Sequence, residues 1–481
     1  MPKAAVAATY LKFLSDAEVE KIHNSALRIL EEVGVQVKHA GALALYQRGG
    51  AVIGGEKDRV KIPYKMIENA LSSSPSEILL SGREESNDLL LKGQFVYAGT
   101  GGAELNVIDL ETKKLRKSML ADVADIARLV DALEYIDFYI RPVVAQDMPH
   151  DLLDINKYYA SLANTTKHVM GNVYYPQKVA EVVEMASVIT GGRQALEKRP
   201  IISFITSWML SPLALNTEVT EILIKIAEHK MPVALSSVAI LGMTSPVTMA
   251  GNLVLTHAEQ LSGIVLCQLV NPGTPVIYGG CPGVADMRNM VFCPGSIERQ
   301  ILNAAVSQMS QYIKIPNYNL AGVTDAKLPD VQAGYEKAFG LCMAVLAGSN
   351  YIHHAAGRIK DGVAYEQYVI DNEIIGMAKR AAQGIRVDDE TLALQEIMEA
   401  GPGGNFLTNP HTVRFFRQEL FFPGLSDRSI REVWEKGGEL DARERARLRA
   451  KEILASHAPV QISSEADKEI RAKFSILYPK A

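Results

Sequence analysis

The chain has 481 residues, of which 48% are hydrophobic and 22% charged. This is the composition of an ordinary globular protein, and it excludes collagenous, coiled-coil and disordered classes. Lys and Arg number 50 against 55 Asp and Glu, which gives a net charge of −5. A surface without basic excess does not supply the attraction that nucleic acids or anionic lipids require, so we expect neither partner.

Four cysteines and the absence of a CxxC pair predict reduced thiols rather than a disulfide framework. The apolar stretch Ala4–Ala8 is too short for the core of a secretory signal. The longer apolar segment Asn252–Val270 contains His257, Glu259 and Gln260, which indicates a buried helix rather than a membrane span. We therefore expect a cytoplasmic protein.

The first ninety residues open with a helix. Ser15 and Glu18 have the spacing of a capping box, and apolar residues from Ile22 to Val33 follow at helical intervals up to Gly34. A short strand is expected directly after Gly34. We predict a small α+β cap over residues 1–90.

Residues 91–384 have the pattern of repeated strand–helix units. About eight short apolar runs are separated by helical segments at roughly 30–40-residue spacing, which predicts a (β/α)₈ TIM barrel. An open, doubly wound sheet is the rival, although no GxGxxG follows the first strand. The eight predicted strands lie near 95–99, 137–144, 168–173, 201–207, 233–238, 275–280, 316–321 and 351–357.

The strand pattern ends at about residue 385. Residues 400–406 are rich in glycine and predict a loop, and residues 427–456 predict a solvated helix packed through Leu448, Ile453 and Leu454. We predict a helical C-terminal extension over residues 385–481 that packs on the barrel.

Barrel enzymes carry their reactive groups at the carboxyl ends of the strands. Here those positions hold many aromatic residues and glycines but few carboxylates. Such rings often only fill space, but they could also form a cage for a quaternary ammonium group through cation–π contacts. The candidate cage residues are Tyr97, Trp208, Tyr278 and Tyr318, with Trp208 first among them.

Two glycine clusters and a histidine pair lie at the same predicted edge. Glycines around residues 99–102 and 279–283 are either turns or positions where a large flat group approaches the backbone. His353 and His354 follow a strand, so alternation should turn one ring inward and the other toward the helices. We find no third ligand beside them and expect no metal site.

The segment 323–335 is a polar loop in which Asp330 is expected to cap a helix that begins near Val331. Lys327 could form a Schiff base, but Schiff-base lysines of barrels usually lie inside a strand.

Together, these segments resemble the trimethylamine methyltransferase family, in its branch without pyrrolysine. The resemblance covers nearly the whole chain, and its motifs are weak singly but specific in combination. They are Leu14–His23, Ile29–Gly34, Tyr278–Gly283, Asp325–Lys327, Asp330–Glu336, Gly401–Leu407, His411-Thr412, Arg414, and the tail with Trp434, Gly437 and Ala446.

The resemblance implies a (β/α)₈ barrel that moves a methyl group from a methylated amine to Co(I) of a corrinoid on a separate small protein. Every residue of this chain is a standard amino acid, so pyrrolysine is absent. Members without it act on quaternary amines, which implies glycine betaine, or alternatively proline betaine, carnitine or γ-butyrobetaine. The family also implies a homo-oligomer.

On this basis we assign site roles in three groups. Substrate binding is expected from Tyr97, Arg141, Trp208, Tyr278, Tyr318, His353 and Arg358, with the betaine carboxylate held among Arg141, His353, His354 and Arg358. Catalytic roles are assigned to Asp325, Lys327 and His354. The corrinoid is expected to face Gly101, Gly279, Gly280, Gly283 and Gln332.

Two other functions remain open. One is a lyase or aldolase that uses Lys327, and the other is a betaine- or corrinoid-binding protein without turnover.

Overall fold

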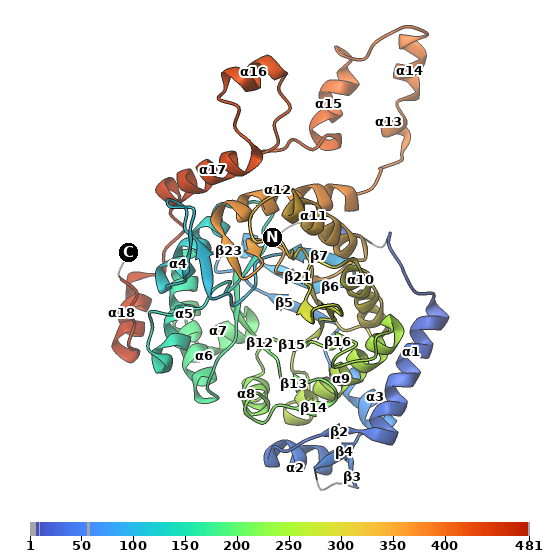
Figure 1. Cartoon of the computed structure of the whole chain (residues 1–481), viewed down its shortest axis with the longest axis vertical. Helices are drawn as coiled ribbons and strands as arrows, with labels where there is room; N and C mark the ends of the chain where they lie inside the picture. The colour runs from blue at the N-terminus through green and yellow to red at the C-terminus, as the bar shows by residue number, and fades with distance from the viewer. Residues whose placement is uncertain (1–5, 9, 55–57, 480–481) are drawn as a thin grey trace.

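A computed structural model describes residues 6–8, 10–54 and 58–479 of the chain (Figure 1). Eight short parallel strands occupy the centre and helices surround them, so the predicted α/β class is confirmed. Each of the eight predicted strands is present. They are β7 (Phe95–Ala98), β10 (Phe138–Ile140), β11 (His168–Gly171), β12 (Ile202–Thr206), β15 (Val233–Ser237), β17 (Val276–Gly280), β20 (Tyr318–Leu320) and β21 (Tyr351–His353).

Regular pairing divides these strands between two sheets. One has the order β10-β11-β12-β15-β17, and the other has the order β7-β21-β20 with β1 (Val6–Ala7) antiparallel at its edge. Single parallel bridges, Gly99 to Phe138 and Tyr278 to Asn317, span the two seams between the sheets. We refer to the eight strands together as the strand core.

Helices alternate with the core strands and bury apolar faces against them. α9 is apolar enough to span a membrane by length and composition, but 83% of its apolar window is buried inside the protein, as the sequence predicted. The surrounding helices are α4 (Leu120–Ala132), α5 (His150–Asn164), α6 (Gln177–Thr190), α7 (Arg193–Lys198), α8 (Thr217–Glu228), α9 (Met249–Val270), α10 (Ile297–Tyr312), α11 (Val331–Leu346) and α12 (Tyr365–Ala382).

The N-terminal segment follows the sequence prediction closely. Ser15 caps α1 (Asp16–Arg28) in a capping box with Glu18, and the helix continues as the π-helix η1 (Ile29–Val33) up to Gly34. β2 (Val35–Gln36) follows. The segment also contains α2 (Ala40–Arg48), β3 (Val52–Ile53), β4 (Arg59–Lys61) and α3 (Tyr64–Ser73).

A hairpin of β5 (Glu77–Leu80) and β6 (Leu89–Lys92) lies at the amino ends of the core strands. Its apolar side chains join the inward-facing residues of the core, including Phe138, Tyr318 and Tyr351, in one buried cluster. The amino-terminal half of the interior is therefore filled, which leaves the carboxyl ends as the place for a cavity.

Short strands continue the chain beyond the carboxyl ends of the core. They form small sheets apart from the core, of which β13 and β14 join β2, β4 and β3 of the N-terminal segment. They are β8 (Asn106–Ile108), β9 (Leu115–Lys117), β13 (Met209–Leu210), β14 (Ala214–Leu215), β16 (Ile240–Leu241), β18 (Gly283–Asp286), β19 (Val291–Phe292), β22 (Arg358–Ile359) and β23 (Gly362–Ala364).

The C-terminal part is helical, and no strand follows residue 364 within the described residues. α17 (Ala442–Ser456) packs on α12 and α4, and α18 (Ser464–Lys473) packs on α6. Ile453 is buried and Leu454 partly buried, whereas Leu448 is 44% exposed, so its predicted packing role is wrong. In this arginine- and glutamate-rich helix, the small residues Ala446 and Ala450 form the buried face instead.

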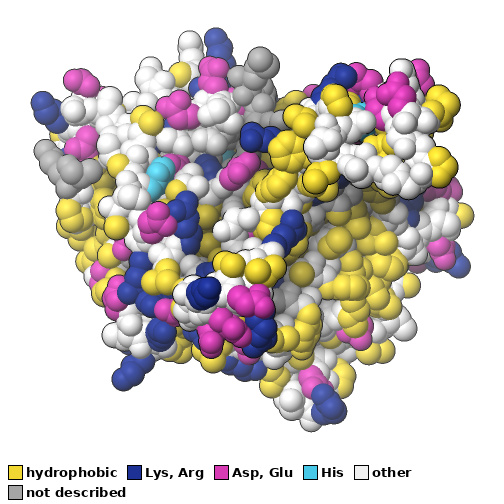
Figure 2. Space-filling model, turned by 90° about the horizontal axis from the view of Figure 1, so that it is seen from above, with side chains coloured by type: hydrophobic (Ala, Val, Ile, Leu, Met, Phe, Trp, Pro, Cys, Tyr) yellow, Lys and Arg dark blue, Asp and Glu magenta, His cyan; other side chains and the backbone are white. Residues whose placement is uncertain are grey.

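Between α12 and α17 the chain makes a long excursion, which we call the projecting arm (residues 385–441; Figure 1). Its helices are α13 (Asp389–Leu392), α14 (Leu394–Ala400), α15 (Pro410–Glu419) and α16 (Arg431–Lys436). Among their described side chains, only Phe415 is buried. Figure 2 looks onto the arm and shows hydrophobic side chains exposed on this side of the molecule.

Candidate active site

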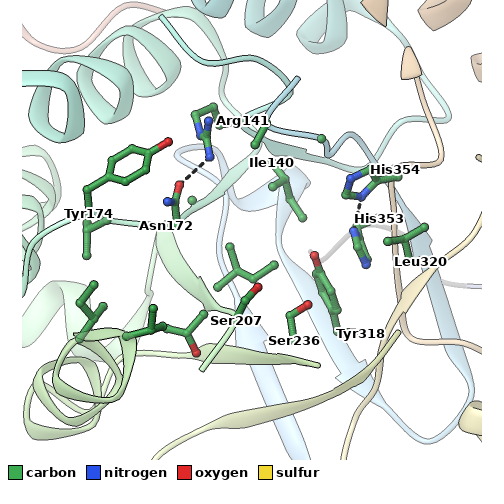
Figure 3. A pocket seen from close by; sticks show the side chains of 18 of the residues that line it. Ile140, Arg141, Asn172, Tyr174, Ser207, Ser236, Tyr318, Leu320, His353 and His354 are labelled. Atoms are coloured by element: carbon green, nitrogen blue, oxygen red, sulfur yellow. Dashed lines mark hydrogen bonds between the residues drawn. The ribbon is translucent and has the colours of Figure 1, made fainter. Parts of the chain in front are cut away.

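A cavity of about 440 Å³ opens at the carboxyl ends of the core strands (Figure 3). Its walls come from residues at or just beyond the ends of β7, β10, β11, β12, β15, β20 and β21, and from the start of α8. Of the residues predicted from sequence, it brings together Arg141, Tyr318, His353 and His354.

One wall of the cavity is made of stacked rings. The imidazole of His353 lies on the ring of Tyr318, with centroids 3.5 Å apart and planes 17° from parallel. Deeper in the core, Tyr351 stacks on Phe138 with centroids 3.6 Å apart. These side chains point inward because they occupy alternate positions on their strands. The deeper pair packs beneath Tyr318 and His353, which line the cavity although each is only 1% exposed.

His353 and His354 both line the cavity, so the expected division into one inward and one outward ring is wrong. The reason is local: the φ angle of His354 is +59°, which ends the strand alternation at that residue. The two Nδ1 atoms form a hydrogen bond with each other (Figure 3). Burial, together with nearby cations, holds the pKa of both imidazoles well below the ordinary histidine value, so both are neutral near pH 7.

Gly101 makes room for this arrangement. A Cβ atom at Gly101 would lie 2.6 Å from Nδ1 and 2.8 Å from the backbone nitrogen of His354. The close approach at this glycine is therefore made by His354, a group of the protein itself.

The opposite wall is a polar network centred on Asn172 (Figure 3). Its Oδ1 accepts hydrogen bonds from Arg141 Nη2 at 2.6 Å and from Lys157 Nζ at 3.3 Å. Lys157 also forms an ion pair with Asp154 at 2.5 Å, and the other oxygen of Asp154 accepts from the Tyr174 backbone N–H at 2.8 Å. Burial, helped by the charge of Arg141, lowers the pKa of Lys157 to about 7 despite the opposing effect of Asp154.

Sequence reasoning missed Lys157 and Asp154. Both lie on α5 rather than at a strand end, and both are buried. An acidic and a basic residue three positions apart, on a helix whose middle is otherwise largely buried, were the available signal.

Other arginines near the cavity differ in their partners. Arg358 forms an ion pair with Glu104 at 2.5 Å, so its charge is already neutralised. Arg299 on α10, which was not predicted, is 1% exposed, and its Nε has no hydrogen-bond partner among the described residues. Burial lowers the pKa of Arg299 to about 10, which leaves it charged.

Three of the predicted cage aromatics lie outside the cavity lining. Tyr97 points to the amino end of the core, where its hydroxyl accepts from Leu90 N–H at 3.3 Å. Tyr278 points outward and hydrogen-bonds His257 of α9 at 2.9 Å. Trp208 is fully buried against Gly263 of α9. These three rings do not join Tyr318 in the cavity. A ring lines the cavity only if its side chain points inward and lies at the carboxyl end of its strand.

The three later predicted glycines are explained by contacts within the protein. A Cβ atom at Gly279 would lie 2.3 Å from the Leu235 carbonyl oxygen, and one at Gly280 would lie 2.7 Å from Thr256. One at Gly283 would meet Ile240 and Phe292 at 2.9 Å. None of the three lines the cavity.

The loop after β20 is also outside the cavity lining. Asp325 forms an ion pair with Lys360 at 2.9 Å and accepts from Gly295 N–H at 2.9 Å. Gln332 donates to Glu336 at 2.9 Å, and Lys327 is exposed. Asp330 caps α11 as predicted, by accepting from Ala333 N–H. The structure thus gives Asp325 and Gln332 contacts that hold the loop.

Within residues 6–8, 10–54 and 58–479, no group of three or more His, Cys, Asp or Glu side chains is arranged to hold a metal ion. Cys281 lies near the histidine pair, with its sulfur 3.7 Å from His353 Nε2, and burial raises its pKa to about 11.

A parallel-strand α/β core with a small-molecule cavity at the carboxyl ends of its strands is the plan of an enzyme site. The fold resembles that of the monomethylamine methyltransferase of Methanosarcina barkeri, with a TM-score of 0.51, 12% identity, and coverage of 95% of this chain and 96% of that one.

The particular family follows from the sequence. The model of the trimethylamine methyltransferase (MTTB) family matches residues 2–475, and the chain belongs to this family. The trimethylamine methyltransferase MttB of Desulfitobacterium hafniense (strain DSM 10664 / DCB-2) is 36% identical over 460 residues, covering 95% of this chain and 92% of that one. The glycine betaine methyltransferase of Desulfitobacterium hafniense (strain Y51) is 33% identical over 463 residues, covering 95% of each chain.

Proposed function

We propose that this methyltransferase moves a methyl group from a quaternary amine to Co(I) of a corrinoid carried by a small partner protein. Glycine betaine, which would leave as dimethylglycine, is the leading substrate, with proline betaine, carnitine and γ-butyrobetaine as alternatives. The observation that carries the proposal is the ring wall of Tyr318 and two neutral imidazoles in the cavity. The similarity to a named glycine betaine methyltransferase supports it.

The ring wall suits a cation that has no N–H to donate. A trimethylammonium group can be held only by ring faces or by a nearby negative charge, since it forms no ordinary hydrogen bonds. A protonated histidine in the wall would repel it, and the low pKa of both imidazoles avoids this repulsion. We assign Tyr318, His353 and His354 to the ammonium end of the substrate.

The reaction requires little acid–base catalysis from the protein. A quaternary nitrogen already carries its positive charge and departs as a neutral amine, so no side chain has to protonate the leaving group. The residues of the cavity therefore bind the amine, exclude water and orient one methyl group toward the opening. Orientation of this kind lowers a barrier by several kcal/mol or more in favourable cases.

A reduced corrinoid supplies a strong nucleophile for the methyl carbon. A cavity of 440 Å³ is of the size of a small-molecule site, and a corrin ring is much larger than a betaine. The substrate would occupy the cavity and the ring would stay at its opening. The buried Gly279, Gly280 and Gly283 have protein neighbours, so we do not assign them to the corrinoid.

The proposal also covers the domain architecture, the oligomeric state and the cellular location of the protein. We take the strand core and its helices, residues 91–384, as a (β/α)₈ barrel, with residues 1–90 as a cap and 385–481 as an extension. The two bridged seams favour this interpretation over an open sheet. A cytoplasmic homo-oligomer is the expected state of the protein.

The test combines the full chain, its cognate corrinoid protein in the Co(I) state and glycine betaine, and measures dimethylglycine by mass spectrometry. Wild type and Lys225→Met, a surface variant on α8 outside the cavity, should both form dimethylglycine. Tyr318→Leu should lose at least about tenfold in kcat/KM, because it removes a ring face from the ammonium. Absence of demethylation with every quaternary amine tested, or turnover of trimethylamine alone, would overturn the proposal.

The lyase alternative has little support, since Lys327 is exposed and outside the cavity lining. Borohydride trapping with carbonyl compounds should give no adduct at this residue. A binding protein without turnover would bind betaine in the calorimeter and form no dimethylglycine.

A further inference from the structure

The polar wall of the cavity contains the buried Arg141 beside a buried ion pair of Lys157 and Asp154. The exposed fractions of these three residues are 7%, 1% and 0%. Lys157 forms an ion pair with Asp154, whereas Arg141 donates to Asn172, whose Oδ1 also accepts from Lys157. Buried cations are normally matched by anions, but the guanidinium of Arg141 has no ion-pair partner among the described residues; Glu218, the carboxylate that lines the cavity, is exposed on α8.

The hydrogen-bond acceptors of the network are already in use. Both oxygens of Asp154 have donors, and Oδ1 of Asn172 accepts from Arg141 and Lys157 together. The Nε of Arg141 is buried without a partner among the described residues, although this side chain lines the cavity (Figure 3). A guanidinium with a free donor offers a carboxylate a charge-assisted hydrogen bond.

We propose that Arg141, with Asn172, Lys157 and Asp154 behind it, forms a carboxylate-binding subsite that makes the enzyme selective for amino-acid betaines. The inference rests on the proposed function and narrows it. Choline, tetramethylammonium and trimethylamine carry the cationic head without the anion and would leave the wall uncompensated. Arg141 contacts the substrate, whereas Lys157 and Asp154 are positioning residues that act through Asn172.

The arrangement places opposite charges at opposite walls. The ammonium faces Tyr318 and the neutral histidines, and the carboxylate faces Arg141. A carboxylate here would also favour the charged form of Lys157, whose pKa burial depresses to about 7. The substrate is thereby oriented by its two ends rather than by its head alone.

The experiment measures binding to the full chain by calorimetry, without the corrinoid protein, with glycine betaine and choline as a pair that differs in the carboxylate. Wild type should bind glycine betaine at least about tenfold more tightly than choline. Arg141→Gln should remove most of this preference, and Lys157→Met should reduce it, because Asn172 loses the second donor that holds its Oδ1. Lys225→Met serves as the matched control and should retain the wild-type ratio.

Equal affinity of wild type for the two ligands, or an unchanged ratio in Arg141→Gln, would overturn the subsite. Loss of the preference in Arg299→Gln alone would also overturn it, because the anion would then bind at the other buried arginine. The two losses predicted for Arg141→Gln and Lys157→Met must occur in folded protein, checked by circular dichroism. If Lys157→Met unfolds, the contrast between Arg141→Gln and the control Lys225→Met still decides.

Methyl-transfer assays separate this inference from the proposed function. Demethylation of choline as fast as glycine betaine would contradict the subsite and leave the function standing. Selective betaine binding without demethylation of any quaternary amine would contradict the function and leave the subsite standing.

Discussion

The sequence predicts which residues follow the core strands, but only partly which of their side chains face the cavity. Tyr318, His353, His354 and Arg141 were identified from their positions after predicted strands, and all four line the cavity. Trp208 met the same criterion but packs outward on α9, because one residue of register exchanges the two faces of a strand. That register depends on tertiary pairing, which the sequence of one strand does not contain.

His168 shows how burial converts a single side chain into a pH effect. Both its ring nitrogens are engaged, Nδ1 with the Ser81 carbonyl at 2.9 Å and Nε2 with the Ser203 hydroxyl at 2.7 Å. Burial lowers its pKa to about 4. Between pH 6.5 and pH 4 the unfolded chain binds a proton at this residue that the folded chain does not. The free energy of unfolding therefore decreases as the pH is lowered through this range.

We expect His168 to cost about 2 kcal/mol of stability between pH 6.5 and pH 5. In His168→Gln, whose amide does not titrate, the loss measured by urea unfolding over this range should be smaller by about that amount. A variant as acid-sensitive as wild type would show that other groups control the effect.

At the scale of elements, the sequence predicted which segments form and where they begin. The capping box at Ser15 and the cap at Asp330 both fix helix starts, because these side chains satisfy free backbone N–H groups locally. Contacts between elements were not predictable. The meeting of Gly101, after β7, with His354, after β21, joins residues that are far apart along the chain.

Gly101→Ala tests this meeting. The added Cβ would lie 2.8 Å from the His354 backbone nitrogen, so the histidine must move. We expect kcat/KM for the quaternary amine to fall at least about tenfold, with a folded protein by circular dichroism. Gly334→Ala is the matched control, since a Cβ there meets nothing within 4 Å on α11 and should leave activity unchanged.

A buried ion pair joins the adjacent helices α11 and α12. Lys337 and Asp371 lie 3.2 Å apart, and both are fully buried. Lys337→Met leaves the carboxylate without its cation, so we expect a loss of about 3–5 kcal/mol in the free energy of unfolding, measured in urea. Lys337→Met combined with Asp371→Asn should be less destabilising than Lys337→Met alone; a larger, additive loss would contradict this coupling.

For the whole molecule, the predicted succession of strands and helices agrees with the structure. Eight strands with helices between them were expected from the repeat spacing, and a strand-free C-terminal part was expected from composition. The projecting arm was not expected, since the whole extension was predicted to pack on the barrel, whereas Leu407 and Val413 of the arm are 83% and 66% exposed. Hydrophobic periodicity indicates that a face can be buried, but not against what.

The arm should be the first part of the molecule to be cleaved. It has few buried contacts, so local opening costs little. Brief trypsin treatment followed by mass spectrometry should show early cuts after Arg386, Arg414, Arg417, Arg428 or Lys436. The two products should stay associated on a native gel, because α17 packs on α12. First cleavage within the strand core would contradict this prediction, and protection that grows with protein concentration would indicate self-association through the arm.

The chain has two tryptophans, and they lie in very different places. Trp208 is fully buried beside the strand core, whereas Trp434 lies on α16 of the arm, where its indole N–H donates to the Leu440 carbonyl at 3.1 Å. Their intrinsic fluorescence is thus a built-in pair of reporters, blue-shifted for the core and red-shifted for the arm. In Trp434→Phe, binding of a partner to the arm should no longer change the tryptophan fluorescence. A change beside the strand core would still be reported by Trp208.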